Sequence, residues 1–133
     1  MNNDNVNHPS HYMAYKLEVI NLTSLLDFNL GNAVKYILRA PFKGHFVEDL
    51  EKAKWYLNHE HTGSSSCVPY VAKKLAKEYN DPLVEMLLEA FPPAGVPASR
   101  SEVKHSLDEV IKRIDSRIYD HILAMKRSEA EGS

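Results

Sequence analysis

Cationic side chains recur at four-residue intervals in the N-terminal half of the chain, at Lys35, Arg39 and Lys43. Residues four apart lie on one face of a helix, and Pro41 would end the helix so that Lys43 follows just beyond it. Cations that converge in this way can hold phosphate oxygens, and arginine can donate two parallel hydrogen bonds. A helix face that simply keeps its charges in water would have the same spacing, so both interpretations stay open.

Two histidines, His8 and His11, flank a Pro-Ser pair in the polar N-terminal stretch. Because imidazole titrates near neutral pH, this pair could transfer a proton, contact a phosphate or bind a metal. No third ligand follows at a metal-binding spacing, so we expect no metal site. A turn whose histidines cap neighbouring helices is the alternative.

An aromatic pair, Trp55-Tyr56, falls within a predicted helix. Adjacent residues of a helix point about 100° apart, so at most one of the two rings can face the core fully. The other could stack on a nucleotide base. Packing of both rings against the C-terminal half is the alternative.

Two carboxylate pairs, Glu48 with Glu51 and Glu78 with Asp81, each have a spacing of three. If the pairs faced each other they could hold magnesium against a triphosphate, an arrangement similar to that of the all-helical nucleotide pyrophosphohydrolases. Asp81 is also explained as a helix N-cap before Pro82. The chain has no Walker loop, no GxGxxG motif and no Ser/His/Asp signature.

The elements that must position these residues are helical, because apolar residues recur at steps of three and four and no segment alternates with period two. We therefore predict an all-α fold. Its expected units are a small helical domain at 1–60, a linker at 61–66 and a C-terminal region at 67–133. The expected helices span about 16–26, 30–40, 47–59, 69–79, 81–90 and 99–127.

The last predicted helix begins with a capping box, Ser99 with Glu102, and carries one long apolar stripe. The stripe comprises Val103, Leu107, Val110, Ile114, Ile118, Ile122 and Met125. A stripe of this length must be covered, either by the shorter helices of the C-terminal region or by the same helix of another subunit. We expect a homo-oligomer, with a polar tail at 128–133.

Composition excludes several classes of protein. The net charge of −2 argues against a nucleic acid polymer as partner. A single cysteine excludes a disulfide within the chain, and no apolar run approaches the ~20 residues of a membrane span. The N-terminus lacks the features of a signal peptide, so we expect a cytoplasmic protein without membrane contact.

Several motifs in the first 60 residues occur together in one order. They are Val6-Asn7-His8-Pro9-Ser10-His11-Tyr12, Glu18-Val19-Ile20, residues 28–40 (FNLGNAVKYILRA), Lys43-Gly44 and residues 48–57 (EDLEKAKWYL). Over about 6–60 the chain resembles a small phage family that is nucleotide-kinase-like. The resemblance implies a phage protein in an infected bacterium that binds nucleotides and forms oligomers. The implied site residues are His8, Ser10, His11, Tyr12, Asn32, Lys35, Tyr36, Arg39, Lys43, Lys52, Trp55 and Tyr56.

Two functions follow as hypotheses. In the first, the protein is a nucleoside monophosphate kinase without a Walker motif, which would use ATP and magnesium. Lys35, Arg39 and Lys43 would neutralise phosphates, and His8 or His11 would orient the acceptor or move a proton. In the second, the protein converts nothing and sequesters a nucleotide or cyclic nucleotide messenger of bacterial anti-phage immunity.

Overall fold

The computed structural model describes residues 15, 17–42, 44–60 and 67–132, and within these ranges the chain forms helices and no β-strand. The predicted all-α fold is confirmed for these residues, whereas the oligomer stays a prediction. The α-helices are α1 (Val19–Thr23), α2 (Phe28–Arg39), α3 (Phe46–Asn58), α4 (Tyr70–Ala76), α5 (Pro82–Glu89) and α6 (Arg100–Gly132). Two 3₁₀ turns, η2 (Ala40–Phe42) and η3 (Lys77–Tyr79), follow α2 and α4.

The boundary between α1 and α2 differs from the prediction because of one cap. The Asp27 carboxylate accepts a hydrogen bond from the amide of Leu30 at 2.8 Å, so α2 begins at Phe28 rather than Leu30. Before this cap, the amides of Leu25 and Leu26 bond to carbonyls three residues back. The end of the predicted helix 16–26 is therefore a turn, and α1 is short.

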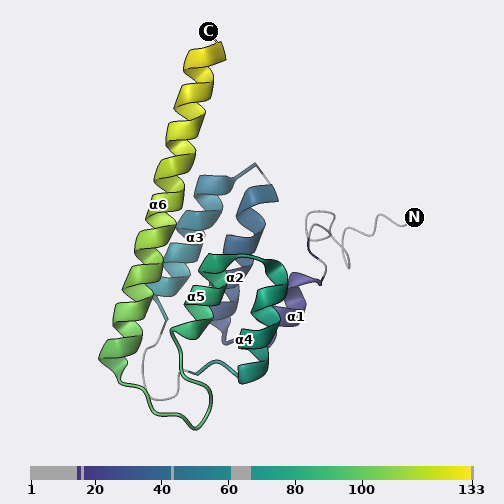
Figure 1. The fold of residues 1–133 in the computed structure, drawn as a ribbon, viewed down its shortest axis with the longest axis vertical. Helices are drawn as coiled ribbons and strands as arrows, with labels where there is room; N and C mark the ends of the chain where they lie inside the picture. The colour runs from purple at the N-terminus through teal and green to yellow at the C-terminus, as the bar shows by residue number, and fades with distance from the viewer. Residues whose placement is uncertain (1–14, 16, 43, 61–66, 133) are drawn as a thin grey trace, which may run out of the picture.

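A helical hairpin of α2 and α3 follows. Pro41 lies within η2, directly after the end of α2, and Gly44 then adopts a φ of 72°, a left-handed conformation that glycine accepts without strain. The chain reverses there, and α3 runs back along α2 (Figure 1). At the opposite end of the hairpin, the Asn29 side chain donates a hydrogen bond to the carbonyl of His59 at 3.0 Å. These contacts align α2 and α3 over most of their lengths.

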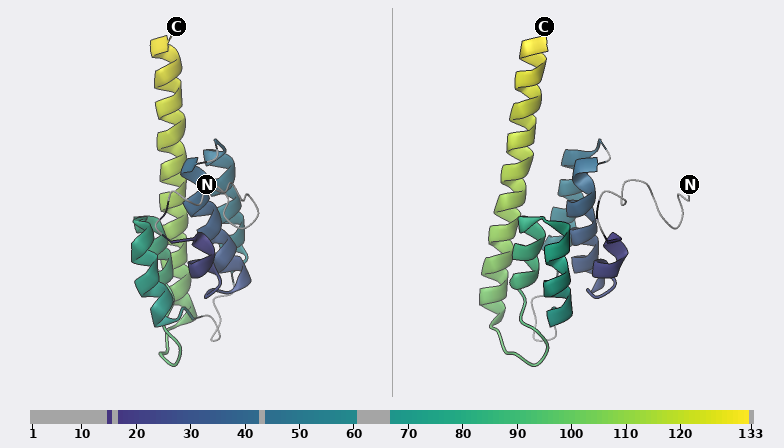
Figure 2. Two further views of the ribbon diagram at one scale, coloured as in Figure 1. Left: turned by 90° about the vertical axis from the view of Figure 1, so that its right-hand side faces the viewer. Right: turned by 45° about the vertical axis from the view of Figure 1, so that its right-hand side comes forward.

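Helix α6 is longer than predicted. Its N-cap is confirmed, since the amide of Glu102 donates to the Ser99 hydroxyl at 3.1 Å. The helix continues to Gly132, so the predicted polar tail is wrong. Glutamate and alanine near the end of the chain are good helix formers, which allows a helix to persist without packing. The end of α6 extends past all the other helices (Figures 1 and 2).

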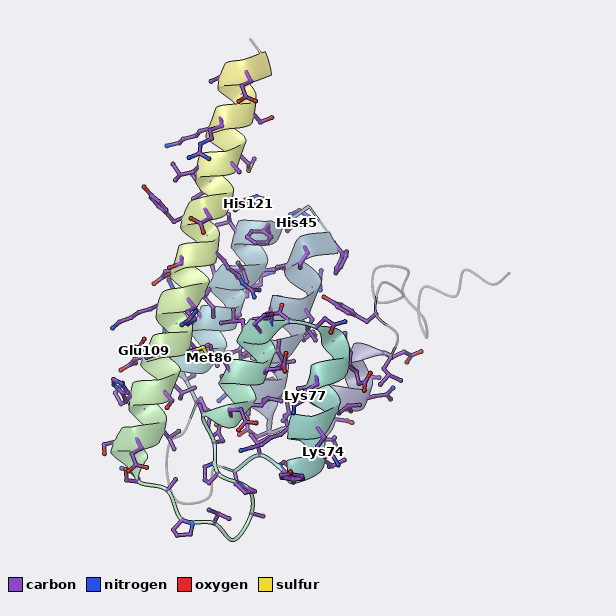
Figure 3. All side chains as sticks on the ribbon, in the orientation of Figure 1. His45, Lys74, Lys77, Met86, Glu109 and His121 are labelled. Carbon is purple, nitrogen blue, oxygen red and sulfur yellow. The ribbon has the colours of Figure 1, made fainter. Side chains whose placement is uncertain are left out.

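One hydrophobic cluster contains buried residues from all six α-helices. Helix α6 packs against α3 on one side and α5 on the other, and its stripe is buried from Val103 to Ile118. Beyond the body of the protein, Ile122 and Met125 are 38% and 52% exposed. Near this point the ring of Phe46, the first residue of α3, stacks on His121 with centroids 4.2 Å apart. Figure 3 labels His121 and His45, the residue before Phe46.

From Val103 to Ile118 the stripe is therefore covered by helices from both halves of the same chain, whereas Ile122 and Met125 stay exposed. No helix in the described ranges has both the length and the apolar character needed to cross a bilayer.

Candidate functional site

Cationic and aromatic side chains gather on the exposed side of the α2–α3 hairpin. The ring of Tyr36 on α2 is at the centre of this cluster. The Lys35 ammonium lies 4.7 Å from the ring centroid, the Lys52 ammonium 5.4 Å and the Arg39 guanidinium carbon 5.9 Å. Lys35 and Arg39 are one turn apart on α2, and the hairpin adds Lys52 from α3. The structure thus brings together cations that are 17 residues apart in the sequence.

A row of rings continues from Tyr36 along the hairpin. Tyr36 stacks on Tyr56 with centroids 6.0 Å apart and an interplanar angle of 15°. Tyr56 in turn contacts Phe28 at 6.0 Å and Trp55 at 5.1 Å, both edge to face. Trp55 also stacks on His59, with centroids 4.0 Å apart.

Phe28 and Trp55 are 74% and 56% exposed, so each has ring surface available to a ligand. We refer to the whole surface as the α2–α3 face. It comprises Phe28, Lys35, Tyr36, Arg39, Lys52, Trp55 and Tyr56.

Acidic neighbours neutralise only part of the charge on the α2–α3 face. Asp49 is 2% exposed, and its Oδ2 lies 3.8 Å from the Nε of Arg39. This is an ion pair but too long for a hydrogen bond, and both atoms are buried without a hydrogen-bond partner among the described residues. Lys52 meets the exposed Glu48 at 3.5 Å. Lys35 makes no ion pair with any described residue, so its charge is available to a ligand.

Asn32 was also expected to bind a ligand. Its side-chain amide nitrogen instead donates to the carbonyl of Phe28, one turn earlier on α2, at 2.8 Å. The structure thus places seven predicted residues on or beside the α2–α3 face: Asn32, Lys35, Tyr36, Arg39, Lys52, Trp55 and Tyr56. The predicted residues His8, Ser10, His11, Tyr12 and Lys43 lie outside the described residues.

The carboxylate hypothesis is wrong for the described residues. No group of at least three His, Cys, Asp or Glu side chains among them is arranged to hold a metal ion. Asp81 instead caps α5, since its Oδ1 accepts from the amide of Leu83 at 2.9 Å. It also receives two hydrogen bonds from Arg117 on α6, at 2.7 and 3.1 Å. This carboxylate is committed to joining α5 and α6.

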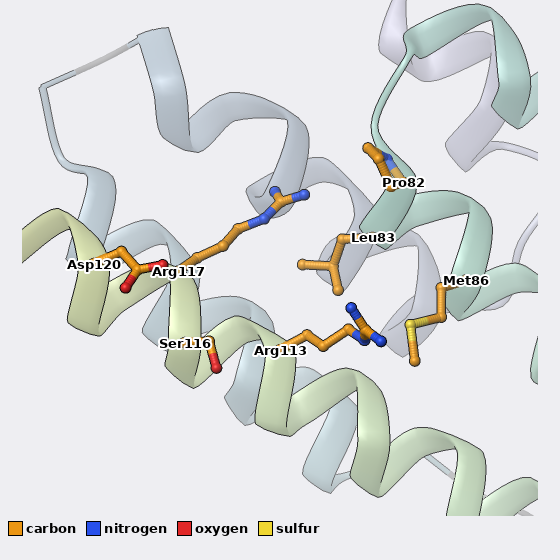
Figure 4. Close-up of a pocket in the computed structure, with 7 residues that line it drawn as sticks. All are labelled: Pro82, Leu83, Met86, Arg113, Ser116, Arg117 and Asp120. Atoms are coloured by element: carbon orange, nitrogen blue, oxygen red, sulfur yellow. The ribbon is translucent and has the colours of Figure 1, made fainter.

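A second charged surface lies where α5 meets α6, and sequence reasoning missed it. A groove of about 300 Å³ there is lined by Pro82, Leu83, Met86, Arg113, Ser116, Arg117 and Asp120. Figure 4 shows the Arg113 and Arg117 side chains extending from α6 across the groove toward α5. The four-residue step between the two arginines was the available signal in the sequence.

Tyr15 ties the chain ahead of α1 to the end of α2. Its hydroxyl donates to the carbonyl of Leu38 at 2.6 Å, and its ring contacts Phe42 and Tyr79 edge to face at 5.4 and 5.6 Å. Burial, with a smaller contribution from the charge of Asp81, raises the pKa of the Tyr15 hydroxyl to about 12. The folded protein therefore favours the protonated, neutral form of the Tyr15 hydroxyl.

Comparison with known proteins gives a match to a family model described as "Protein of unknown function (DUF3310)" over residues 6–58. The matched stretch includes α1, α2 and α3 but is less than half of the 133-residue chain. No curated protein and no solved structure matches the chain. The description of the matching family names no activity, so the expected nucleotide-kinase-like family is wrong. The similarity does cover the residues that build the α2–α3 face.

Proposed function

We propose that the α2–α3 face binds a nucleotide, with its phosphates against Lys35, Arg39 and Lys52 and its base against Trp55. The observation that carries the proposal is the clustering of these three cations within 6 Å of the Tyr36 ring centroid. Three like charges around one ring repel one another, and the ring together with the nearby carboxylates of Asp49 and Glu48 offsets only part of that cost. A phosphate group would relieve the repulsion and accept several charge-assisted hydrogen bonds at once.

The aromatic row supports a nucleotide over a simple inorganic anion. Tyr56 is the one ring between Tyr36, where the cations gather, and Trp55, whose ring is half exposed. A ligand lying along this row would have its phosphates at one end and a flat ring at the other. Stacking on an exposed aromatic side chain tolerates any base, so this feature gives no preference among bases.

The geometry of the α2–α3 face supports nucleotide binding and gives no separate support for phosphoryl transfer. Phosphoryl transfer was implied only by the family resemblance, which is wrong, whereas sequestration of an intact nucleotide requires no more than this face. The two nevertheless differ in a simple readout. After incubation with the protein, the ligand is released by heat and separated by chromatography, so that intact nucleotide and any product are measured separately.

Isothermal titration calorimetry with ATP, deoxynucleoside monophosphates, cyclic dinucleotides and ADP-ribose tests the proposal. We expect Lys35→Ala and Lys52→Ala each to weaken the best ligand about tenfold or more. These variants are preferred to Arg39→Ala, which would leave the buried Asp49 carboxylate without its cation.

Lys74→Ala is the matched control, because Lys74 also lies over a tyrosine, 5.9 Å from the ring of Tyr70, but on α4. The proposal fails if no nucleotide binds, or if all three lysine variants bind like the wild-type protein.

A further inference from the structure

Helix α6 carries a strip of charged residues that faces away from the hydrophobic core. The strip comprises Glu109, Arg113, Asp120 and Arg127, at steps of four, seven and seven residues. Steps of four and seven keep side chains on one side of a helix. Glu109 is partly exposed and the other three are exposed. Two members of the strip, Arg113 and Asp120, also line the groove between α5 and α6 (Figure 4).

The fold of the single chain makes little use of these charges. Glu109 meets Lys112 on its own helix at 3.3 Å, an exposed pair of the kind that contributes little stability. Arg113, Asp120 and Arg127 form no ion pair with a described residue. Arg117, one turn from Arg113, differs in being fixed to Asp81. Apart from the exposed Glu109–Lys112 pair, the strip is therefore a row of charges without ion-pair partners among the described residues.

The order of charge along the strip is negative, positive, negative, positive. Read in the opposite direction, the same strip is positive, negative, positive, negative. A second copy of α6 placed antiparallel would set Arg113 opposite Asp120 of the partner subunit and would bring Glu109 and Arg127 to within three residues of exact register, whereas a parallel copy in register would place like charges together. A twofold axis produces this reciprocal arrangement automatically, because each contact between two residues occurs twice.

We propose that a second copy of this chain packs antiparallel against the strip, with Arg113 opposite Asp120 of the partner subunit. The reciprocal pair is the same contact seen from the other chain. Outside it, Glu109 would be offset from Arg127 of the partner subunit by three residues, about 4.5 Å along the helix, which the long arginine side chain can span, again on both sides of the axis. This interface lies on a different side of α6 from the apolar stripe, which the chain itself covers from Val103 to Ile118.

The centre of the interface suits close approach. The midpoint between Arg113 and Asp120 falls between Ser116 and Arg117. Ser116 is a small side chain that lets two helices come near each other, and the Arg117 side chain is held against Asp81. Beside Ser116, Pro82 and Met86 of α5 give the groove an apolar wall that a partner helix can cover. Exposed ion pairs select a partner and its orientation more than they add affinity, so burial of this wall must supply part of the binding energy.

One like-charged pair opposes this arrangement. Glu102 would face Glu131 of the partner subunit, but both lie roughly 22 Å from the crossing point along α6. Packed helices cross at angles of about 20° or more, so their ends have separated at that distance. The repulsion at the ends is therefore small beside the contacts at the centre.

Charge exchange tests the proposal. Sedimentation velocity of the full chain over a range of concentrations should show a monomer–dimer equilibrium. Arg113→Asp alone, or Asp120→Arg alone, places like charges opposite each other twice and should weaken the dimer about tenfold or more. The double variant, with both changes, restores opposite charges and should return the dimerisation constant to within about threefold of the wild-type value.

Lys126→Asp is the control, since this exposed cation lies roughly 140° around the helix from Arg113 and should leave the dimer unchanged. Circular dichroism of each variant shows whether the fold is kept. The proposal is overturned if the wild-type chain is monomeric at every concentration. It is also overturned if the single variants dimerise normally, or if the double variant stays as weak as the single ones, as it would for a different partner protein.

Discussion

Arg117 on α6 donates two hydrogen bonds to the Asp81 carboxylate at the start of α5, one from each terminal nitrogen of its guanidinium, at 2.7 and 3.1 Å. The carboxylate side chain is only 11% exposed, and it also caps α5 through the amide of Leu83. A carboxylate in this position must be compensated, because removal from water penalises the charged form. The pair therefore fixes where α5 begins along α6, and with it one wall of the groove used in the proposed dimer.

Removal of the cation from this pair should destabilise the fold. We expect Arg117→Ala to lower the free energy of unfolding by about 2 kcal/mol, since Asp81 would remain buried without a cation. Arg117→Lys should recover only part of the loss, because lysine cannot donate in the bidentate manner. Urea denaturation of each variant, followed by circular dichroism, measures the difference.

Lys112→Ala provides the matched control for Arg117→Ala. Lys112 is also a cation of α6 in an ion pair, with Glu109, but its side chain is 73% exposed. We expect its removal to change stability by about 0.5 kcal/mol or less. Equal losses for the two variants would show that the Asp81 pair has no special structural role.

Trp55 should distinguish nucleotides from ligands that have phosphates but no base. Its ring is 56% exposed, so Trp55→Ala should leave the fold intact. We expect this variant to weaken ATP binding about tenfold, through loss of one base stack, and to leave binding of inorganic tripolyphosphate unchanged. Calorimetry with both ligands measures the two effects. A similar loss for both would place the base elsewhere, and Tyr70→Ala on α4 is the control for removal of an exposed ring.

Local chemistry made most of the helices predictable. Asp81 before Pro82 and Ser99 before Glu102 are caps that act within a few residues, and both form as predicted. The predicted helix bounds were wrong in two places, one where another residue capped a helix earlier than expected and one where a helix continued into an exposed segment. The Asp27 cap starts α2 two residues early and shortens the helix before it, and α6 continues past Arg127 although residues 128–132 are exposed.

The sequence predicted which residues form the candidate site better than it predicted which of them contact one another. The four-residue step from Lys35 to Arg39 implied a shared face, but only the hairpin brings Lys52 to the same ring. The contact between Arg39 and Asp49 depends on how α2 packs on α3, and no spacing in the sequence encodes it. Asp81 shows the converse, because its helix-capping role was predictable and its partner Arg117, 36 residues away, was not.

Tyr15 should make stability fall in alkaline solution. Its pKa is about 12 in the folded protein, above the ordinary value near 10, so the unfolded chain ionises first. Its contribution is complete below about pH 10, declines as pH rises and is lost above about pH 12. We expect the free energy of unfolding of the wild-type chain to fall by about 1–2 kcal/mol more than that of Tyr15→Phe across this range. Urea titrations at a series of pH values measure this difference.

Tyr79, whose pKa burial also raises, titrates in both proteins and cancels in the comparison. Parallel curves for the two proteins would mean that the Tyr15 hydroxyl ionises as freely in the folded chain as in the unfolded one.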